Sequence, residues 1–213
     1  MTELIQTYGL PLLRALGIHT AYVLISVAIG FIFGLILGIL LSRVPQFSGI
    51  LMPLLSIFQT IPGLVFIGVL YILWGGTPAA VIIALSVYAM FPILKNTYAG
   101  ILGVDRKYVD AARGCGMTTF QSLLKVQLPL AMPSIIAGLR MAAIYTVSWT
   151  VLASMIGLGG LGDFVYQGVD SNNNLLILLG AIPAALLAVV LGALIDHLQK
   201  HVTPRGMRKE ETH

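Results

Sequence analysis

The amino-acid sequence predicts an all-α membrane protein with about five transmembrane helices, its N-terminus outside the cell and its C-terminus inside. First, 58% of the 213 residues are hydrophobic and 9% are charged, whereas soluble domains carry about a quarter charged residues. Second, five apolar segments each reach the roughly 20 residues that cross a hydrocarbon core about 30 Å thick. Third, lysine and arginine are distributed unevenly between the connecting segments. Lipid must therefore surround much of the chain.

The five predicted spans form a transmembrane domain over residues 19–199. They are His19–Leu41, Gly49–Trp74, Pro78–Leu102, Ser134–Ile156 and Leu175–Leu198. The first is longer than the core of a signal peptide and follows no basic segment, so we expect it to be retained. Residues 1–18 before it are a candidate interfacial segment, and residues 200–213 form a short basic tail.

Orientation follows from the rule that cytoplasmic segments carry an excess of lysine and arginine. With the N-terminus outside, the inner side holds Arg43, Lys95, Arg106, Lys107, Arg113, Lys125, Lys200, Arg205, Arg208 and Lys209. The outer side holds Arg14. Arg140 falls inside the fourth span, about 9 Å from its start at 1.5 Å per residue. It is either an anchor that reaches the inner headgroups or part of a polar pathway.

The longest polar stretch, residues 105–129, predicts a helical hairpin on the cytoplasmic side. Asp105 is a good N-cap for a first short helix. Gly116 suits the left-handed conformation that ends such a helix. Thr118 and Gln121 have the spacing of a capping box that opens a second helix. Pro129 cannot continue the backbone ladder, so we expect that second helix to stop near Leu128.

Residues 157–174, between the fourth and fifth spans, predict an outer glycine-rich loop. Its sequence GLGGLG fits the spacing of a dinucleotide-binding turn, but a transmembrane span rather than a strand precedes it. We therefore interpret it as a flexible loop that contacts an external partner or lines an outer gate. Its residues of interest are Gly157, Gly159, Gly160, Gly162 and Asp163.

Polar residues inside the spans are candidates for a solute pathway. They are Gln59, Asn96, Tyr145, Ser148 and Trp149. Gate or pathway roles and helix packing remain open for them, whereas Thr60 favours packing. The glycines at positions 30, 34 and 38 recur every four residues, which suits close helix contact.

Other classes of function lack their residues. His19, His197 and His201 fall at the predicted membrane edges, so we interpret them as interface residues, and no nucleophile and base can be paired. No metal site can be assembled within the spans, no phosphate-binding G-x-x-x-x-G-K-[ST] occurs, and no basic patch with interleaved aromatics suggests nucleic acid. The single cysteine, Cys115, excludes an internal disulfide.

The hairpin resembles the "EAA" loop of permease subunits in type I ATP-binding-cassette importers. The pattern is acidic-Ala-Ala, then Gly, then an aliphatic residue and Leu-Pro at fixed spacing. It is carried here by Asp110, Ala111, Ala112, Gly116, Val126, Leu128 and Pro129. Asp110 stands where Glu is usual and Val126 where Ile is usual. The resemblance implies that the hairpin docks into a separate ATPase subunit.

Further stretches resemble the branch of permeases for glycine betaine, carnitine and choline: QTIPGL at 59–64, KNTYAGI at 95–101, GLGGLGD at 157–163 and VTPRG at 202–206. The resemblance implies a non-enzymatic subunit in the plasma membrane of a prokaryote. It implies a second permease subunit, two ATPase subunits that bind ATP and Mg²⁺, and an external solute-binding protein. Two alternatives remain: an importer permease for an amino acid or another small solute, and a stand-alone channel or secondary carrier.

Overall fold

The computed structural model describes residues 2–202, which are almost entirely helical and contain no strand. Four helices in this range are long and apolar enough to cross a membrane, and a bent pair of shorter helices gives a fifth candidate span. The prediction of an all-α fold with about five spans is confirmed. The motif at 202–206 and most of the predicted basic tail lie outside the described residues.

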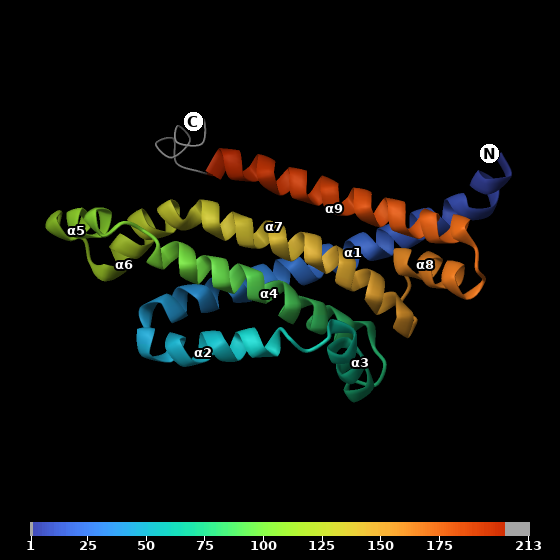
Figure 1. Cartoon of the computed structure of the whole chain (residues 1–213). Coiled ribbons are helices and arrows are strands. Elements are labelled where there is room, and N and C mark those ends of the chain that lie inside the picture. The colour runs from blue at the N-terminus through green and yellow to red at the C-terminus, as the bar shows by residue number, and fades with distance from the viewer. Residues whose placement is uncertain (1, 203–213) are drawn as a thin grey trace.

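The chain runs through α1 (Thr2–Arg43), α2 (Pro45–Phe58), α3 (Gly63–Leu73) and α4 (Pro78–Leu102). It continues through α5 (Arg106–Gly114), α6 (Thr119–Ser122), a π-helical turn η1 (Leu123–Gln127) and α7 (Leu128–Ala153). A 3₁₀ turn η2 (Ser154–Ile156), α8 (Leu161–Asp170) and α9 (Asn174–Val202) complete it. Figure 1 shows α1, α4, α7 and α9 as long rods, with α5 and α6 at one end and α8 at the other.

Helix α1 is continuous across the predicted boundary at Ile18. Its 42 residues span about 63 Å at 1.5 Å per residue, about twice the hydrocarbon thickness. The residues before the predicted first span therefore extend the same helix. They lie at the end of the molecule that also holds α8 (Figure 1).

Helix α4 is the centre of the bundle, packed between α1 and α7. The glycines at 30, 34 and 38 make the α1 contact close, as predicted. A Cβ at Gly34 would lie 2.8 Å from the Met90 carbonyl oxygen, and one at Gly38 would lie 2.9 Å from that of Leu94. Gly138 in α7 plays the same part, since its Cβ would lie 2.8 Å from the Pro92 carbonyl oxygen. Small residues thus let the backbones approach.

The second predicted span, Gly49–Trp74, is not one straight helix. It is divided into α2 and α3, which meet at an angle of 90°. The break falls at Gln59–Pro62, which includes the predicted pathway residue Gln59. Pro62 is the N-cap of α3 and lacks the N–H that would continue α2.

Two further predictions were wrong. The helix after Thr118 does not stop near Leu128 but continues through Pro129 to Ile156. The segment 157–174 is not a loop throughout, because Leu161–Asp170 forms α8.

Candidate functional site

The hairpin at residues 105–129 is built by three local signals, all of which the sequence predicts. The Asp105 side chain accepts a hydrogen bond from the Lys107 backbone N–H at 3.0 Å and caps α5. Thr118 and Gln121 form the capping box, with bonds of 3.2 and 2.9 Å. Because these caps satisfy N–H groups that a helix start leaves free, both short helices are fixed locally.

The turn between α5 and α6 depends on Gly116, which has φ +78°. Its N–H donates to the Arg113 carbonyl at 2.9 Å, and the Met117 N–H donates to the Ala112 carbonyl at 3.0 Å. These two bonds make the Schellman motif that ends a helix with a left-handed residue. The predicted glycine turn is thus confirmed in geometry.

The hairpin presents a mixed surface beyond the bundle. Asp110 and Ala111 are exposed, whereas Ala112 is buried against the second arm. Tyr108, Phe120 and Leu124 are 47%, 67% and 47% exposed. Large apolar side chains left uncovered in a short polar segment indicate an interaction surface.

The second arm joins α7 through η1 rather than ending. The Leu128 N–H bonds to the Leu123 carbonyl, five residues back, which is the π-helical register. Pro129 then occupies the first turn of α7, a position that proline favours. Val126, Leu128 and Pro129 are half-buried. The sequence signal of the proline was correct, but it marks a change of register instead of a stop.

Arg43 ties the end of α1 to this arm. Its Nη2 donates to Gln127 Oε1 at 3.1 Å, and Gln127 Nε2 donates to Ser122 Oγ at 3.2 Å. Gln127 and Ser122 are buried, at 7% and 2% exposure. Sequence reasoning missed all three residues. The available signal was a glutamine directly before Leu-Pro.

The bend between α2 and α3 gathers polar and aromatic groups. Lys95 Nζ donates to Gln59 Oε1 at 2.5 Å, and the Tyr88 hydroxyl donates to the Ile61 carbonyl at 2.7 Å. Both bonds connect α4 to the bend. Because a broken helix frees backbone carbonyls, the tyrosine hydroxyl satisfies one of them.

Trp149 of α7 also packs against the bend. Its ring lies 5.0 Å from the Tyr88 ring, centroid to centroid. A Cβ added to Gly63 would fall 1.8 Å from Trp149 Cζ3, so only glycine fits at the start of α3. Phe58, Phe66 and Phe91 extend the same aromatic cluster.

The other predicted pathway residues lie in different surroundings. Tyr145 and Ser148 are exposed on one stripe of α7. The Asn96 amide donates to the Pro92 carbonyl at 2.8 Å and the residue lies at the α4–α7 contact. Thr60 donates to the Ile57 carbonyl at 2.7 Å within its own turn. The structure therefore brings Gln59 and Trp149 to one bend and leaves Asn96 in helix packing.

The glycine-rich segment at the opposite end is a folded turn. Gly157, Gly159 and Gly160 have φ of +80°, +77° and +109°, and the Ser154 hydroxyl donates to the Gly159 carbonyl at 2.9 Å. Gly162 is buried, with Val151 carbonyl oxygen 2.3 Å from where its Cβ would lie. The helix α7 and the turn η2, rather than a strand, precede this segment, so it lacks the strand–turn–helix context of a dinucleotide site.

His19 is not the interface residue that was predicted. It is 0% exposed. A Cβ on Gly160 would lie 3.4 Å from His19 Nδ1. The helix α1 continues past the predicted membrane edge, so the ring is covered by the glycine turn and α7.

Arg140 also has a partner that the sequence did not indicate. Its Nε lies 2.8 Å from Asp196 Oδ1, joining α7 to α9. Gly192 of α9 lies beside the guanidinium, since a Cβ built on it would lie 3.8 Å from Arg140 Nε. The ion pair gives this cation a compensating charge within the fourth span.

Two carboxyl groups outside the spans have shifted pKa values. The hydrogen bonds from the side chain and backbone of Lys107 lower the pKa of Asp105, which fits its capping role. Burial raises the pKa of Asp163 in α8. In the described part of the chain no three His, Cys, Asp or Glu side chains come together to hold a metal ion.

Comparison with known proteins bears on this arrangement. The model of a family described as "Binding-protein-dependent transport system inner membrane component" matches residues 30–208. The glycine betaine/carnitine/choline transport system permease protein OpuCB of Bacillus subtilis (strain 168) is 36% identical over 208 residues, covering 98% of this chain and 96% of the relative. The carnitine transport permease protein OpuCB of Listeria monocytogenes is 37% identical, covering 96% and 94%.

Solved structures share the fold. A structure described as inward-facing conformations of the MetNI methionine ABC transporter aligns with a TM-score of 0.82 at 23% identity, covering 91% of this chain and 97% of the other. A second, of an amino acid ABC transporter with histidines, gives 0.73 at 20% identity, covering 92% and 96%. At these identities the likeness concerns the fold alone.

Proposed function

Because the chain belongs to the family of inner membrane components of binding-protein-dependent transport systems, we propose that it forms the translocation pathway for a quaternary-ammonium solute of the glycine betaine, carnitine and choline class. Relatives named for these solutes at 36–37% identity over nearly the whole chain support the substrate class. The membership itself makes the chain a multi-pass membrane permease. A stand-alone channel or secondary carrier does not fit that family.

The hairpin at 105–129 is the contact with the ATPase subunit in this proposal. The single observation that carries it is the pairing of the acidic-Ala-Ala-Gly pattern with a rigid capped hairpin whose apolar side chains are uncovered. Asp110 and Ala111 offer a carboxylate and a small surface for close approach. ATP and Mg²⁺ are bound by the partner, and this chain contributes the docking element.

The solute pathway requires a second permease subunit. The polar stripe of Tyr145 and Ser148 on α7 is exposed in the single chain, and so are most outward residues of α2 and α3. Polar groups exposed at membrane depth are expected to face a water-filled cavity or another protein chain. Two such faces together enclose a path that one chain leaves open.

Transport in this proposal follows alternating access. ATP draws the two ATPase subunits together, the docked hairpins move with them, and the helices rearrange as rigid bodies. An external binding protein delivers the solute at the end that carries α8. Hydrolysis resets the complex, so the membrane helices respond to a nucleotide cycle that they do not perform.

An amino acid or another small solute is the alternative substrate class that the sequence left open. The names of the more similar relatives favour the quaternary-ammonium class over it.

The test is reconstitution of the permease with its cognate ATPase and binding protein. Uptake of labelled glycine betaine or choline into the vesicles should require ATP and the binding protein. Uptake of amino acids only would overturn the substrate class. ATP-independent passage at the full rate would overturn the importer assignment.

A further inference from the structure

A cavity of about 490 Å³ lies between the N-terminal part of α1 and α8, at the end of the molecule opposite the hairpin. It is separate from the bend at Gln59 and from the exposed stripe of α7. The function proposed above uses none of its side chains. Its volume is ample for a small organic solute or a lipid headgroup.

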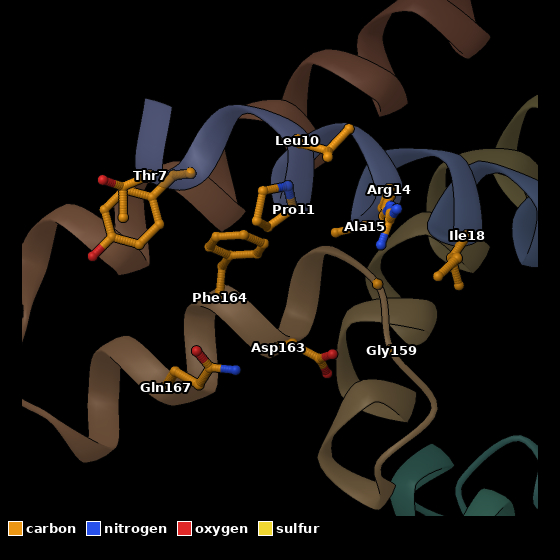
Figure 2. A pocket seen from close by; sticks show the side chains of 12 residues that line it. Thr7, Leu10, Pro11, Arg14, Ala15, Ile18, Gly159, Asp163, Phe164 and Gln167 are labelled. Carbon is orange, nitrogen blue, oxygen red and sulfur yellow. The ribbon is translucent and has the colours of Figure 1, made fainter. Parts of the chain in front are cut away.

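The cavity holds one cation and one carboxylate, supplied by different helices. Arg14 comes from α1 and Asp163 from α8, and Figure 2 shows the two side chains on opposite sides of the space. No ion pair within 4 Å joins them, and neither has another charged partner among the described side chains. Opposite charges held apart in this way leave room for a molecule that carries both.

The carboxylate of Asp163 lies against the backbone that lines the cavity. A Cβ on Gly159 would lie 3.9 Å from Asp163 Oδ2, so the glycine backbone lies directly beside it. Burial raises the pKa of Asp163, which means that the ionised form lacks compensation there. A cationic group close to this oxygen would supply that compensation. Arg14 is exposed at the mouth and remains in contact with water.

Aromatic rings close one side of the cavity. Phe164 is 9% exposed and its ring meets the Tyr8 ring edge to face, with centroids 6.5 Å apart. In Figure 2 the Phe164 ring lies under Pro11, and the Asp163 carboxylate lies on the Gly159 side of the cavity. The two rings and the Asp163 carboxylate line the same cavity, a combination that suits an alkylated ammonium group.

We propose that this cavity binds a small zwitterion, with its ammonium group against Asp163 and the aromatic wall and its acidic group on Arg14. The same chemistry occurs in a free betaine and in a zwitterionic lipid headgroup. The choice of glycine betaine as probe rests on the proposed function, whereas the positions of Arg14 and Asp163 in the cavity do not depend on that function.

The experiment uses the permease with its ATPase partner in nanodiscs, without the binding protein and without ATP. Equilibrium binding of labelled glycine betaine and of choline is measured in discs made of phosphatidylglycerol alone. Choline carries the quaternary ammonium but no carboxylate. Arg14→Gln should weaken glycine betaine binding about tenfold and leave choline unchanged, since one charged hydrogen bond is lost. Asp163→Asn should weaken both by a similar factor.

Asp170→Asn is the matched control, since Asp170 is exposed on the same helix and does not line the cavity. It should change neither ligand's affinity. A second arm adds phosphatidylethanolamine to the discs and counts the lipid retained after delipidation. If a headgroup is the occupant, phosphatidylethanolamine should suppress glycine betaine binding, and both cavity variants should lose the retained lipid.

The proposal is overturned if binding of both probes and retention of phosphatidylethanolamine are the same in the wild type, Arg14→Gln and Asp163→Asn. That outcome would leave the proposed function standing as long as ATP-driven uptake with the binding protein persists. Loss of such uptake in the wild type would instead count against the importer and not against the cavity.

Discussion

Arg43, in the last turn of α1, donates a hydrogen bond to the side chain of Gln127 in the π-helical turn that joins the hairpin to α7. The donor and acceptor are 3.1 Å apart and 84 residues apart in sequence. The hairpin is therefore bonded to two long helices, covalently to α7 and through this contact to α1. Movement of the hairpin can therefore be transmitted to both α1 and α7.

Removing the Gln127 side chain should uncouple α1 from the hairpin. In Gln127→Ala we expect ATP hydrolysis by the complex to continue while solute taken up per ATP falls several-fold, because buried hydrogen bonds to a charged group are lost. Gln127→Glu should restore coupling, since its carboxylate can accept from Arg43. Lys125→Ala, in the same turn and exposed, should behave as the wild type. Equal uptake per ATP in all variants would contradict the linkage.

Substitution of Gly116 should act through backbone conformation. No atom lies within 4 Å of a Cβ built there, but φ is +78°. A residue with a side chain pays about 1–2 kcal/mol in this region, so Gly116→Ala should lower stimulated ATPase activity and uptake while membrane insertion stays normal. Gly116→Asn should be milder, because asparagine tolerates this conformation.

Gly114→Ala provides the control for that prediction. Gly114 lies two residues earlier, within α5, and its Cβ would also meet open space. Alanine favours a helix, so the variant should be neutral or slightly stabilising. Equal damage from both variants would indicate a partner contact instead of the turn.

The bend at α3 should not accept a side chain at Gly63. A Cβ there would fall 1.8 Å from Trp149 Cζ3. The indole of Trp149 is also packed against the Tyr88 ring. Gly63→Ala should destabilise the protein by about 1–3 kcal/mol, measured as a lower thermal midpoint in detergent. Gly68→Ala in the same helix, with open space around it, is the control. Trp149→Leu in the Gly63→Ala background should recover part of the loss.

Asp163 should make stability depend on pH in a predictable direction. Its pKa is raised in the folded protein, so the folded state keeps the proton to higher pH than the unfolded state does. Stability is then lost as pH rises from the ordinary carboxyl pKa through the raised value, and it stays constant above. Asp163→Asn should raise the thermal midpoint at neutral pH, with the difference vanishing at low pH. A difference that grows as pH falls would contradict the assignment.

The sequence predicts the fold and the hairpin well because both depend on local signals. The caps at Asp105 and Thr118 and the turn at Gly116 are decided by neighbours within a few residues, and all three form as predicted. The glycines of α1 and the apolar spans follow from periodicity in the same way. These features need no knowledge of distant contacts.

What the sequence could not predict depends on contacts between distant segments. The partnership of Arg140 with Asp196 requires knowing that α7 lies beside α9. The burial of His19 requires the glycine turn to fold over α1. The prediction of a helix end near Leu128 was wrong because the π turn before Pro129 changes the hydrogen-bond register. Pro129 then lies in the first turn of α7.

The surroundings of the predicted pathway residues also depend on contacts between distant segments. Gln59 and Trp149 both lie at the bend, where Gln59 bonds to Lys95 of α4 and Trp149 packs against Gly63 of α3. Asn96 bonds to its own helix, and Tyr145 and Ser148 remain exposed. The sequence makes any polar residue in a span a candidate for the solute pathway. Whether that residue is packed between helices or exposed depends on the segments that surround it.

The central claim is that the hairpin is a cytoplasmic contact for an ATPase subunit, and the one cysteine of the chain tests it directly. Cys115 is exposed and lies within the turn, next to Gly116. A membrane-impermeant maleimide should label it in inside-out vesicles and not in right-side-out vesicles. Added ATPase subunit should then slow the labelling strongly in the wild type but not in Asp110→Lys. Labelling from the outer face, or an unchanged labelling rate in a complex that still performs ATP-driven uptake, would contradict the account.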